Sequence, residues 1–153
     1  MPTARYATGA AVLDGKIYVV GGRTGLTRLA TVEVYDPATN AWSQAPPMST
    51  ACSYLGVAVL GGKLYAAGGF DGTNRLSSVE VFDPQTNAWT TLAPMSTARN
   101  GFAMAAVQGK LYVAGGNTSP PLATVEAYDP QQNRWEAVAP MAQARYGCGA
   151  AAI

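Results

Sequence analysis

The chain has 153 residues, 48% of them hydrophobic, and its 10 Lys and Arg residues nearly balance its 9 Asp and Glu residues. That length fits one domain with a core, and the near-zero charge offers no basic field for a nucleic acid or a membrane surface. Histidine is absent, which removes the commonest general base and zinc ligand, so we expect no enzyme, no cofactor and no metal.

The first predicted strand is rich in Gly and Ala and covers residues 6–13. Copies of it return at residues 53–60, 100–107 and 146–153. A strand with so little side-chain bulk suits a crowded place, where only small residues allow close backbone approach. We therefore place these strands nearest to the axis on which the repeated units converge.

A two-residue turn leads from each of the first three copies into the second predicted strand. The turns match the X-Gly signal of a β-hairpin and are Asp14-Gly15, Gly61-Gly62 and Gln108-Gly109. The second strand begins with Gly-Lys-(Ile or Leu)-Tyr and closes on a double glycine. The double glycines are Gly21-Gly22, Gly68-Gly69 and Gly115-Gly116.

The third predicted strand has an alternating pattern and is rich in β-branched residues. It reads T-V-E-V-Y-D-P at residues 31–37, S-V-E-V-F-D-P at 78–84 and T-V-E-A-Y-D-P at 124–130. Its Asp-Pro pair predicts a tight turn in which a following Asn takes the left-handed position. A fourth strand completes each unit as its outer edge and carries Trp42, Trp89 or Trp135.

These elements recur at a spacing of about 47 residues, which is in the range of propellers and other repeat arrays. Residues 1–153 therefore form a single unit built of repeats. Its parts are repeat 1 (2–48), repeat 2 (49–95), repeat 3 (96–141) and the inner strand of a fourth repeat (142–153). Periodic aromatic residues in such an array indicate packing between the units.

Three motifs of the repeat resemble the kelch repeats of the BTB-kelch adaptor proteins: G-K-[IL]-Y-x-x-G-G, V-E-x-[YF]-D-P-x-x-N-x-W and P-M-x-x-[AR]-R. The resemblance covers essentially the whole chain. It implies an all-β, kelch-type β-propeller segment with three four-stranded antiparallel blades and one additional inner strand, out of a ring of about six or seven blades. The sequence contains no BTB or BACK segment, so the resemblance implies recognition of a partner and not recruitment of a ubiquitin ligase.

Positions that differ between strict repeats are free of scaffold constraints, and the loops on one rim of a propeller build binding surfaces. Some of these positions directly follow a double glycine, and others lie in the variable loops. A third group directly follows a loop position before the inner strand, which holds arginine in three of its four copies. By resemblance, these loops line a peptide-binding face around the central channel. The candidate binding residues are Tyr6, Arg23, Arg28, Ser53, Phe70, Asp71, Arg75, Asn100, Asn117 and Tyr146.

The chemistry of these candidates indicates the class of ligand. Arginine can grip carboxylates or phosphates bidentately, and the candidates include Arg23, Arg28 and Arg75. Aromatic side chains are rigid anchors of the kind enriched at binding hot spots, and the candidates include Tyr6, Phe70 and Tyr146. We therefore expect a non-catalytic module that binds a partner protein or peptide, acidic or phosphorylated.

The loop position directly before Tyr6, Ser53, Asn100 and Tyr146 has a different role. It holds Arg5, Arg99 and Arg145, with Cys52 in the second repeat. Because the arginine recurs, we expect it to be structural and to support the loop that enters the inner strand.

Three blades leave a ring open at both ends. A homodimer would close a six-bladed ring, but its two chains would supply eight inner strands where six are needed. Either one copy of the inner strand is displaced at each junction, or the chain is a truncated portion of a longer protein. A self-assembling half-propeller scaffold with no ligand of its own is a second alternative. A sugar-handling kelch enzyme is a third, and it is less favoured because most carboxylates occupy repeat-equivalent positions.

The location of the protein is expected to be cytoplasmic. The N-terminus lacks the basic and apolar regions of a signal peptide, and no apolar run is long enough to span a bilayer. Cys52 and Cys148 lie far apart without C-x-x-C spacing, so we expect both thiols to be reduced.

Overall fold

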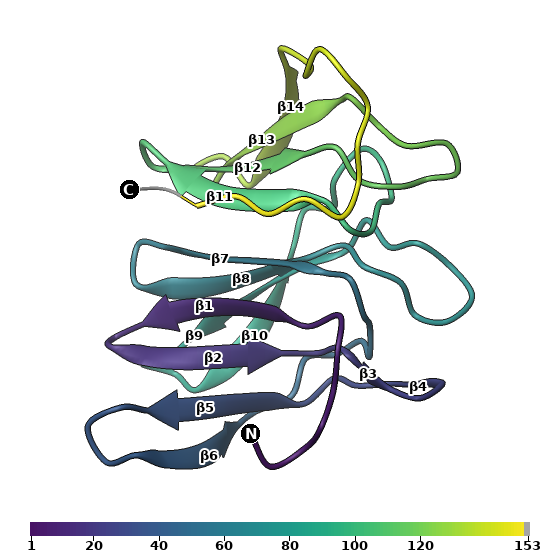
Figure 1. The fold of residues 1–153 in the computed structure, drawn as a ribbon. Helices are drawn as coiled ribbons and strands as arrows, with labels where there is room; N and C mark the ends of the chain where they lie inside the picture. Colours follow the sequence, from purple (N-terminus) through teal and green to yellow (C-terminus); the bar gives the residue numbers. More distant parts are fainter. Residues whose placement is uncertain (152–153) are drawn as a thin grey trace.

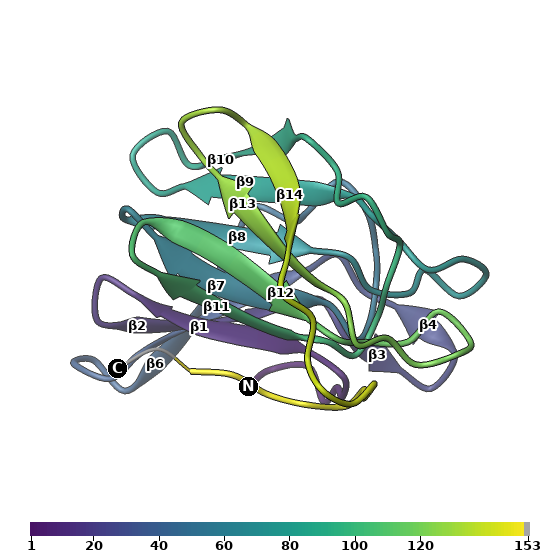
Figure 2. The ribbon, with the colours of Figure 1, turned by 90° about the horizontal axis from the view of Figure 1, so that it is seen from above.

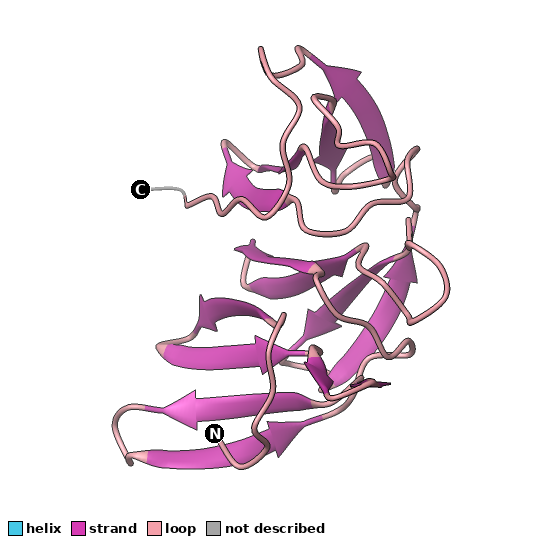
Figure 3. Ribbon diagram, turned by 45° about the vertical axis from the view of Figure 1, so that its right-hand side comes forward, coloured by secondary structure: helices cyan, strands magenta, loops and turns pink. Residues whose placement is uncertain are grey.

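Residues 1–151 are described by the computed structural model, and over this range strands and loops alternate without any helix (Figure 1, Figure 3). This part of the chain accordingly has no helical segment long and apolar enough to cross a membrane. Three four-stranded antiparallel sheets follow one another along the chain and stand side by side as the blades of an open arc. The expectation of an all-β propeller segment with three blades is confirmed.

Each blade runs from an inner to an outer strand. Blade 1 consists of β1 (Gly9–Leu13), β2 (Lys16–Val20), β5 (Val32–Asp36) and β6 (Ala41–Ala45). Blade 2 consists of β7 (Gly56–Leu60), β8 (Lys63–Ala67), β9 (Val79–Asp83) and β10 (Ala88–Leu92). Blade 3 consists of β11 (Ala103–Val107), β12 (Lys110–Ala114), β13 (Val125–Asp129) and β14 (Arg134–Val138). A small hairpin of β3 (Arg23–Thr24) and β4 (Thr27–Arg28) leaves blade 1 after its double glycine.

The turns within a blade have the chemistry that the sequence predicts. Between β1 and β2, Asp14 and Gly15 both have positive φ, at 50° and 73°, which is the geometry of a tight two-residue hairpin. Between β5 and β6, the Asp36 carboxylate accepts a hydrogen bond from Ala38 N at 2.9 Å, and Asn40 takes a left-handed φ of 52°. Equivalent turns recur in the other two blades.

The glycine-rich strands occupy the crowded inner position that their composition predicts. Strands β1, β7 and β11 are neighbours across the blade boundaries (Figure 1). A Cβ added to Gly56 would lie 2.5 Å from the Phe102 ring and 3.0 Å from Met104 of the next blade. Only a residue without a side chain allows this approach.

Two apolar cores fill the spaces between the blades. The first joins Val32 of blade 1 to Leu64 of blade 2, and the second joins Val79 of blade 2 to Leu111 of blade 3. All four side chains are buried. The arc is therefore held together by burial of apolar surface between successive sheets.

The tryptophans of the outer strands β10 and β14 add a polar contact to this packing. Trp89 Nε1 donates to the carbonyl oxygen of Pro46 at 2.8 Å, and Trp135 Nε1 donates to that of Ala93 at 2.9 Å. Each tryptophan also lies against an aromatic ring of its own blade, as Trp89 does against Phe82 with ring centroids 5.4 Å apart. The periodic aromatic residues thus pack within the blades and hydrogen-bond one blade to the next, as predicted.

The inner strands begin later than the sequence predicted. Strand β1 starts at Gly9 and not at Tyr6, because residues 6–8 cross towards the loop that follows the double glycine. There Tyr6 exchanges two backbone hydrogen bonds with Arg23, with N–O distances of 3.1 and 2.9 Å. The same shift occurs at the start of β7 and β11.

The predicted inner strand of a fourth repeat does not form in residues 142–151. This segment still follows the path of the repeat beside β11 (Figure 1), and Gly147 N donates to Gly101 O at 2.7 Å. An inner strand pairs only with the second strand of its own blade, and the described residues hold no such strand after Tyr146. The end of the prediction, residues 152–153, lies outside the described residues.

Candidate functional site

The loops after the double glycines and the linkers into the inner strands lie on one side of the arc, at the right in Figure 1 and Figure 2. Isolated β-bridges join the two loop classes within each blade: Tyr6 with Arg23, Ser53 with Phe70, and Asn100 with Asn117. The structure therefore brings together the positions that the sequence singled out. We call this side the rim surface, and its residues are Tyr6, Arg23, Arg28, Tyr54, Phe70, Asp71, Arg75, Asn100, Asn117 and Tyr146.

The double glycine sets the direction in which each rim loop leaves its blade. Gly68 has a φ of 58°, and a Cβ there would lie 2.6 Å from the carbonyl oxygen of Arg99 and 2.7 Å from the Phe102 ring. Gly69 N donates a hydrogen bond to the same Arg99 oxygen at 2.9 Å. The double glycine thus lies directly against the linker that contains Arg99, and this contact fixes the position at which Phe70 begins the rim loop.

Two rim arginines lie over aromatic rings. Arg23 Cζ is 4.7 Å from the centroid of the Tyr6 ring, and Arg28 Cζ is 5.2 Å from that of Phe70. The second contact crosses from blade 1 to blade 2. Cation–π contacts at such sites contribute about 0.5–1 kcal/mol, and they hold the guanidinium groups in place on the surface.

A third rim arginine links blade 2 to blade 3. Arg75 Nη2 donates to Ser119 Oγ at 3.1 Å. Within residues 1–151, the ion pairs involve other side chains, and Arg23, Arg28 and Arg75 have no carboxylate partner. The rim surface therefore carries three guanidinium groups whose charge no ion pair neutralises.

Asp71 lies on the rim surface, but its carboxylate is engaged within its own loop. Its Oδ1 accepts hydrogen bonds from Asn74 N at 2.6 Å and from Thr73 N at 2.7 Å. These hydrogen bonds hold the pKa of Asp71 below its usual value, and the charge of Arg28 adds to the effect. Asp71 thus shapes the loop through its Oδ1 atom.

A hollow of about 280 Å³ opens at the blade 3 end of the rim surface. It lies between Tyr54 and Tyr146, whose side chains are 41% and 61% exposed. Asn100 and Asn117 form part of its wall, and the buried Oδ1 atom of Asn100 accepts no hydrogen bond within the described residues. The hollow offers two aromatic faces and amide groups to a ligand.

Ser53, which the sequence suggested as a binding residue, does not reach the rim surface, whereas its neighbour Tyr54 does. Ser53 is fully buried and its hydroxyl donates to the Phe70 carbonyl at 3.4 Å, so it lies beneath the rim surface and is unable to contact a ligand. Tyr54, the next residue, reaches the surface instead. Its repeat equivalents are Ala7 and Gly101, a variation that could have marked Tyr54 as a candidate.

Two of the three recurrent loop arginines serve the scaffold, as expected. The side chains of Arg5 and Arg99 are fully buried and pair with Glu33 at 2.9 Å and with Glu126 at 2.6 Å. Burial lowers the pKa of Arg99, and the charge of Glu126 opposes that shift. Arg145 is exposed, because the described residues hold no further blade to receive it.

Among residues 1–151, no three Cys, Asp or Glu side chains gather closely enough to hold an ion.

A family model described as the "KLHDC2/KLHL20/DRC7 Kelch-repeats domain" matches residues 1–153. Among solved structures, the chain is similar to one titled "Structure of YjhT", with a TM-score of 0.79 and 19% identity over 90% of this chain and 53% of that one. At this level of identity the likeness concerns the fold.

Curated relatives match over shorter stretches. Kelch-like protein 6 of Homo sapiens is 57% identical over 37 residues, which are 24% of this chain and 6% of that protein. F-box/kelch-repeat protein At4g39580 of Arabidopsis thaliana is 48% identical over 56 residues, which are 36% of this chain and 15% of that protein. The chain therefore spans only a small part of the length of these relatives.

Proposed function

The chain belongs to the kelch-repeat family, and on that premise we propose that it is a non-catalytic protein-interaction module. Kelch repeats are generally protein-interaction modules. In this chain the rim surface binds an acidic or phosphorylated segment of a partner protein.

The observation that carries the proposal is the set of three unpaired guanidinium groups on the rim surface. Arg23 and Arg28 are held by aromatic rings, and Arg75 is held by Ser119. Because their side chains are already positioned, less conformational entropy is lost when a carboxylate or phosphate binds. The rings of Tyr6 and Tyr146 are exposed on the same rim surface and supply apolar contact area.

Composition supports the non-catalytic part of the proposal and a cytoplasmic location. The chain has no histidine to act as a general base. Cys52 and Cys148 form no disulfide, and free thiols persist in a reducing compartment.

The ligand class is tested with labelled peptides of matched length that carry glutamate, phosphoserine or neutral residues at the same positions. We expect the acidic and phosphorylated peptides to bind more tightly, with an affinity that falls as salt is added. Arg28→Gln combined with Arg75→Gln should weaken their binding at least about tenfold, because a hydrogen bond to a charged group contributes about 1.5–3 kcal/mol. Fluorescence anisotropy measures each affinity.

Arg134→Gln is the matched control, because Arg134 is an exposed arginine on the outer strand β14, outside the rim surface. It should leave peptide affinity unchanged. The acidic ligand class is abandoned if neutral peptides bind equally well, or if the control weakens binding as much as the rim variants do.

We further propose that two copies of the chain close a six-bladed ring. Within the chain, the tryptophan of one blade donates to the linker of the blade before it, as Trp89 does to Pro46. Trp42 of blade 1 makes no such bond within the described residues, and Ala139 follows blade 3 at the position equivalent to Pro46. The end face of blade 1 is thus complementary to the end face of blade 3 in a second copy.

The count of inner strands is consistent with this ring. Each chain supplies three of them, β1, β7 and β11, so two chains supply the six that six blades need. Residues 142–151 form no strand and have to move aside at each junction to admit β1 of the second copy.

Light scattering coupled to size exclusion tests the ring, and we expect a species at twice the chain mass of 15.8 kDa. Trp42→Phe removes the indole N–H together with part of the ring, and it should weaken the dimer at least about 5-fold, because each of the two junctions loses a hydrogen bond that contributes about 0.5–1.5 kcal/mol. Trp135→Phe is the control and should leave the dimer affinity unchanged, since Trp135 bonds within its own chain. A monomer at every concentration contradicts the dimer and favours a ring completed within a longer chain.

A further inference from the structure

The buried arginines of blades 1 and 3 occupy a slot with a fixed set of oxygen acceptors. In blade 3, Arg99 Nη1 donates to the carbonyl oxygens of Gly115 at 2.8 Å and Thr124 at 3.1 Å. Its Nη2 donates to Glu126 Oε1 at 2.6 Å. Arg5 in blade 1 bonds to the equivalent glycine, threonine and glutamate. The slot is thus built to surround a positive charge with oxygen atoms.

Blade 2 has the acceptors but not the arginine. Gly68, Ser78 and Glu80 stand at the equivalent positions, while Cys52 occupies the place of the arginine. Glu80 is only 6% exposed, and its Oε1 accepts a hydrogen bond from Ser49 N at 3.0 Å. No cationic side chain pairs with it within residues 1–151. A carboxylate buried without a countercharge is costly.

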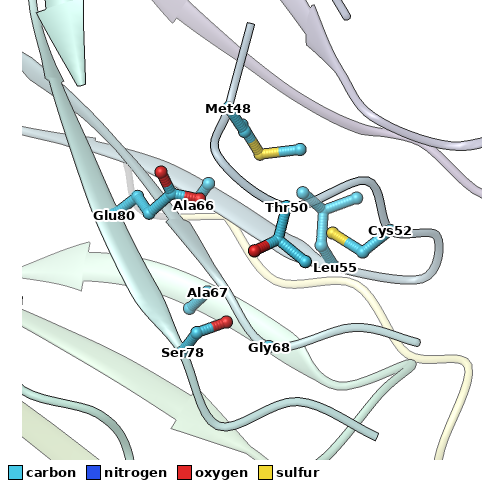
Figure 4. A pocket seen from close by; sticks show the side chains of 9 residues that line it. All are labelled: Met48, Thr50, Cys52, Leu55, Ala66, Ala67, Gly68, Ser78 and Glu80. Atoms are coloured by element: carbon cyan, nitrogen blue, oxygen red, sulfur yellow. The ribbon is translucent and has the colours of Figure 1, made fainter. Parts of the chain in front are cut away.

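A small cavity lies where the arginine would be. Glu80 and Ser78 reach it from the start of β9 and Thr50 from the linker before β7, and Figure 4 shows their side-chain oxygens turned towards the space between them. Cys52 and Leu55 close it on another side. Its volume of about 10 Å³ is roughly the room that one water-sized particle needs.

The charge of the cavity wall is minus one. Burial, with the nearby charges of Glu80 and Asp71, raises the pKa of the Cys52 thiol to about 12, so the thiol stays neutral and is not a second anion. One carboxylate with neutral hydroxyl and carbonyl oxygens is a hard donor set. Its single charge is balanced by a monovalent cation and not by a divalent one.

We propose that this cavity is a binding site for a water-sized monovalent cation, potassium or ammonium, held by Glu80, Ser78 and Thr50. The cation supplies the positive charge that Arg5 and Arg99 supply in the other two blades. Blade 2 is then completed by an ion taken from solution, and its stability depends on that ion. This inference does not rest on the proposed function of the rim surface.

Thermal unfolding of the full chain tests the site in KCl, NH₄Cl and tetramethylammonium chloride at equal ionic strength. The tetramethylammonium ion is too large for the cavity and controls for screening. At cation concentrations several times the dissociation constant, we expect a midpoint about 2–4 °C higher in KCl or NH₄Cl. Equal midpoints in all three salts mean that the cavity holds water only, and they overturn the proposal.

Two variants and one control assign the response to this cavity. Glu80→Gln should abolish the difference between the salts, and Cys52→Arg should abolish it while raising the midpoint in every salt, because the guanidinium group is then supplied by the chain itself. Asp14→Asn removes an exposed carboxylate at a hairpin turn and should keep the full difference. A potassium response that persists in Cys52→Arg contradicts the site, and this test holds even where Glu80→Gln does not fold.

Discussion

Replacing Arg99 by methionine is expected to lower the free energy of unfolding by about 3–5 kcal/mol. Arg99 is fully buried, and the change leaves the carboxylate of Glu126, which is 2% exposed, without a countercharge. The loss also leaves the carbonyl oxygen of Gly115 without its donor, while that of Thr124 keeps the hydrogen bond from Gly115 N. Urea unfolding followed by tryptophan fluorescence measures the effect.

Two further variants separate the charge from the loss of packing. Arg134→Met removes an exposed arginine and should change stability by less than about 0.5 kcal/mol. Adding Glu126→Gln to Arg99→Met should recover part of the loss, because no unpaired charge remains buried. A single Arg99→Met variant as stable as Arg134→Met would show that the buried ion pair does not hold blade 3.

Replacing Gly68 by alanine is expected to lower the free energy of unfolding by about 2–4 kcal/mol. The loss has two causes, which a second variant can separate. The first is the left-handed φ of 58°, which costs a residue with a Cβ about 1–2 kcal/mol. The second is overlap, because the new Cβ would lie 2.6 Å from the carbonyl oxygen of Arg99. Neither atom belongs to a flexible side chain, so the linker itself has to shift.

Gly61→Ala is the matched variant for this measurement. Gly61 has the same φ of 58°, but a Cβ there meets nothing within 4 Å. We expect Gly61→Ala to lose only the free energy that comes from the left-handed φ. The urea midpoint of Gly68→Ala should therefore be well below that of Gly61→Ala. If the two variants are equally stable, the double glycine is required only for its φ and not for the approach of the next linker.

Much of the fold could be predicted because its signals are local. The Asp14-Gly15 turn, the Asp36 turn with Asn40, and the bulk-free inner strands each follow from short stretches of sequence and return at a constant spacing. The positions of the rim loops could be predicted for the same reason. Variation within a strict repeat marks residues that the scaffold does not fix.

The parts that could not be predicted depend on contacts between distant residues. Strand β1 starts at Gly9 because Tyr6 is drawn into a bridge with Arg23, and sequence pattern alone does not show that pairing. Ser53 is buried although its repeat equivalent Tyr6 is exposed, and its hydroxyl donates to the Phe70 carbonyl oxygen.

The contacts of single side chains and the cavities beside them could not be predicted from the sequence either. The stacking of Arg28 on Phe70 joins two blades and has no signature in either loop. The cavity beneath Cys52 exists because cysteine is too small to fill the space that an arginine fills in the other two blades. Its wall is assembled from three segments of the chain. Sequence comparison marked Cys52 only as a departure from the repeat.

The central claim is that a partner protein binds at the rim surface, and backbone amide shift mapping tests it most directly. The isotope-labelled protein is titrated with the acidic peptide that binds most tightly. We predict that the perturbed amides cluster in residues 23–28, 70–75 and 117–121, with Tyr54 and Tyr146. Shifts confined to the outer strands β6, β10 and β14, or no saturable shift with any peptide, would contradict the claim.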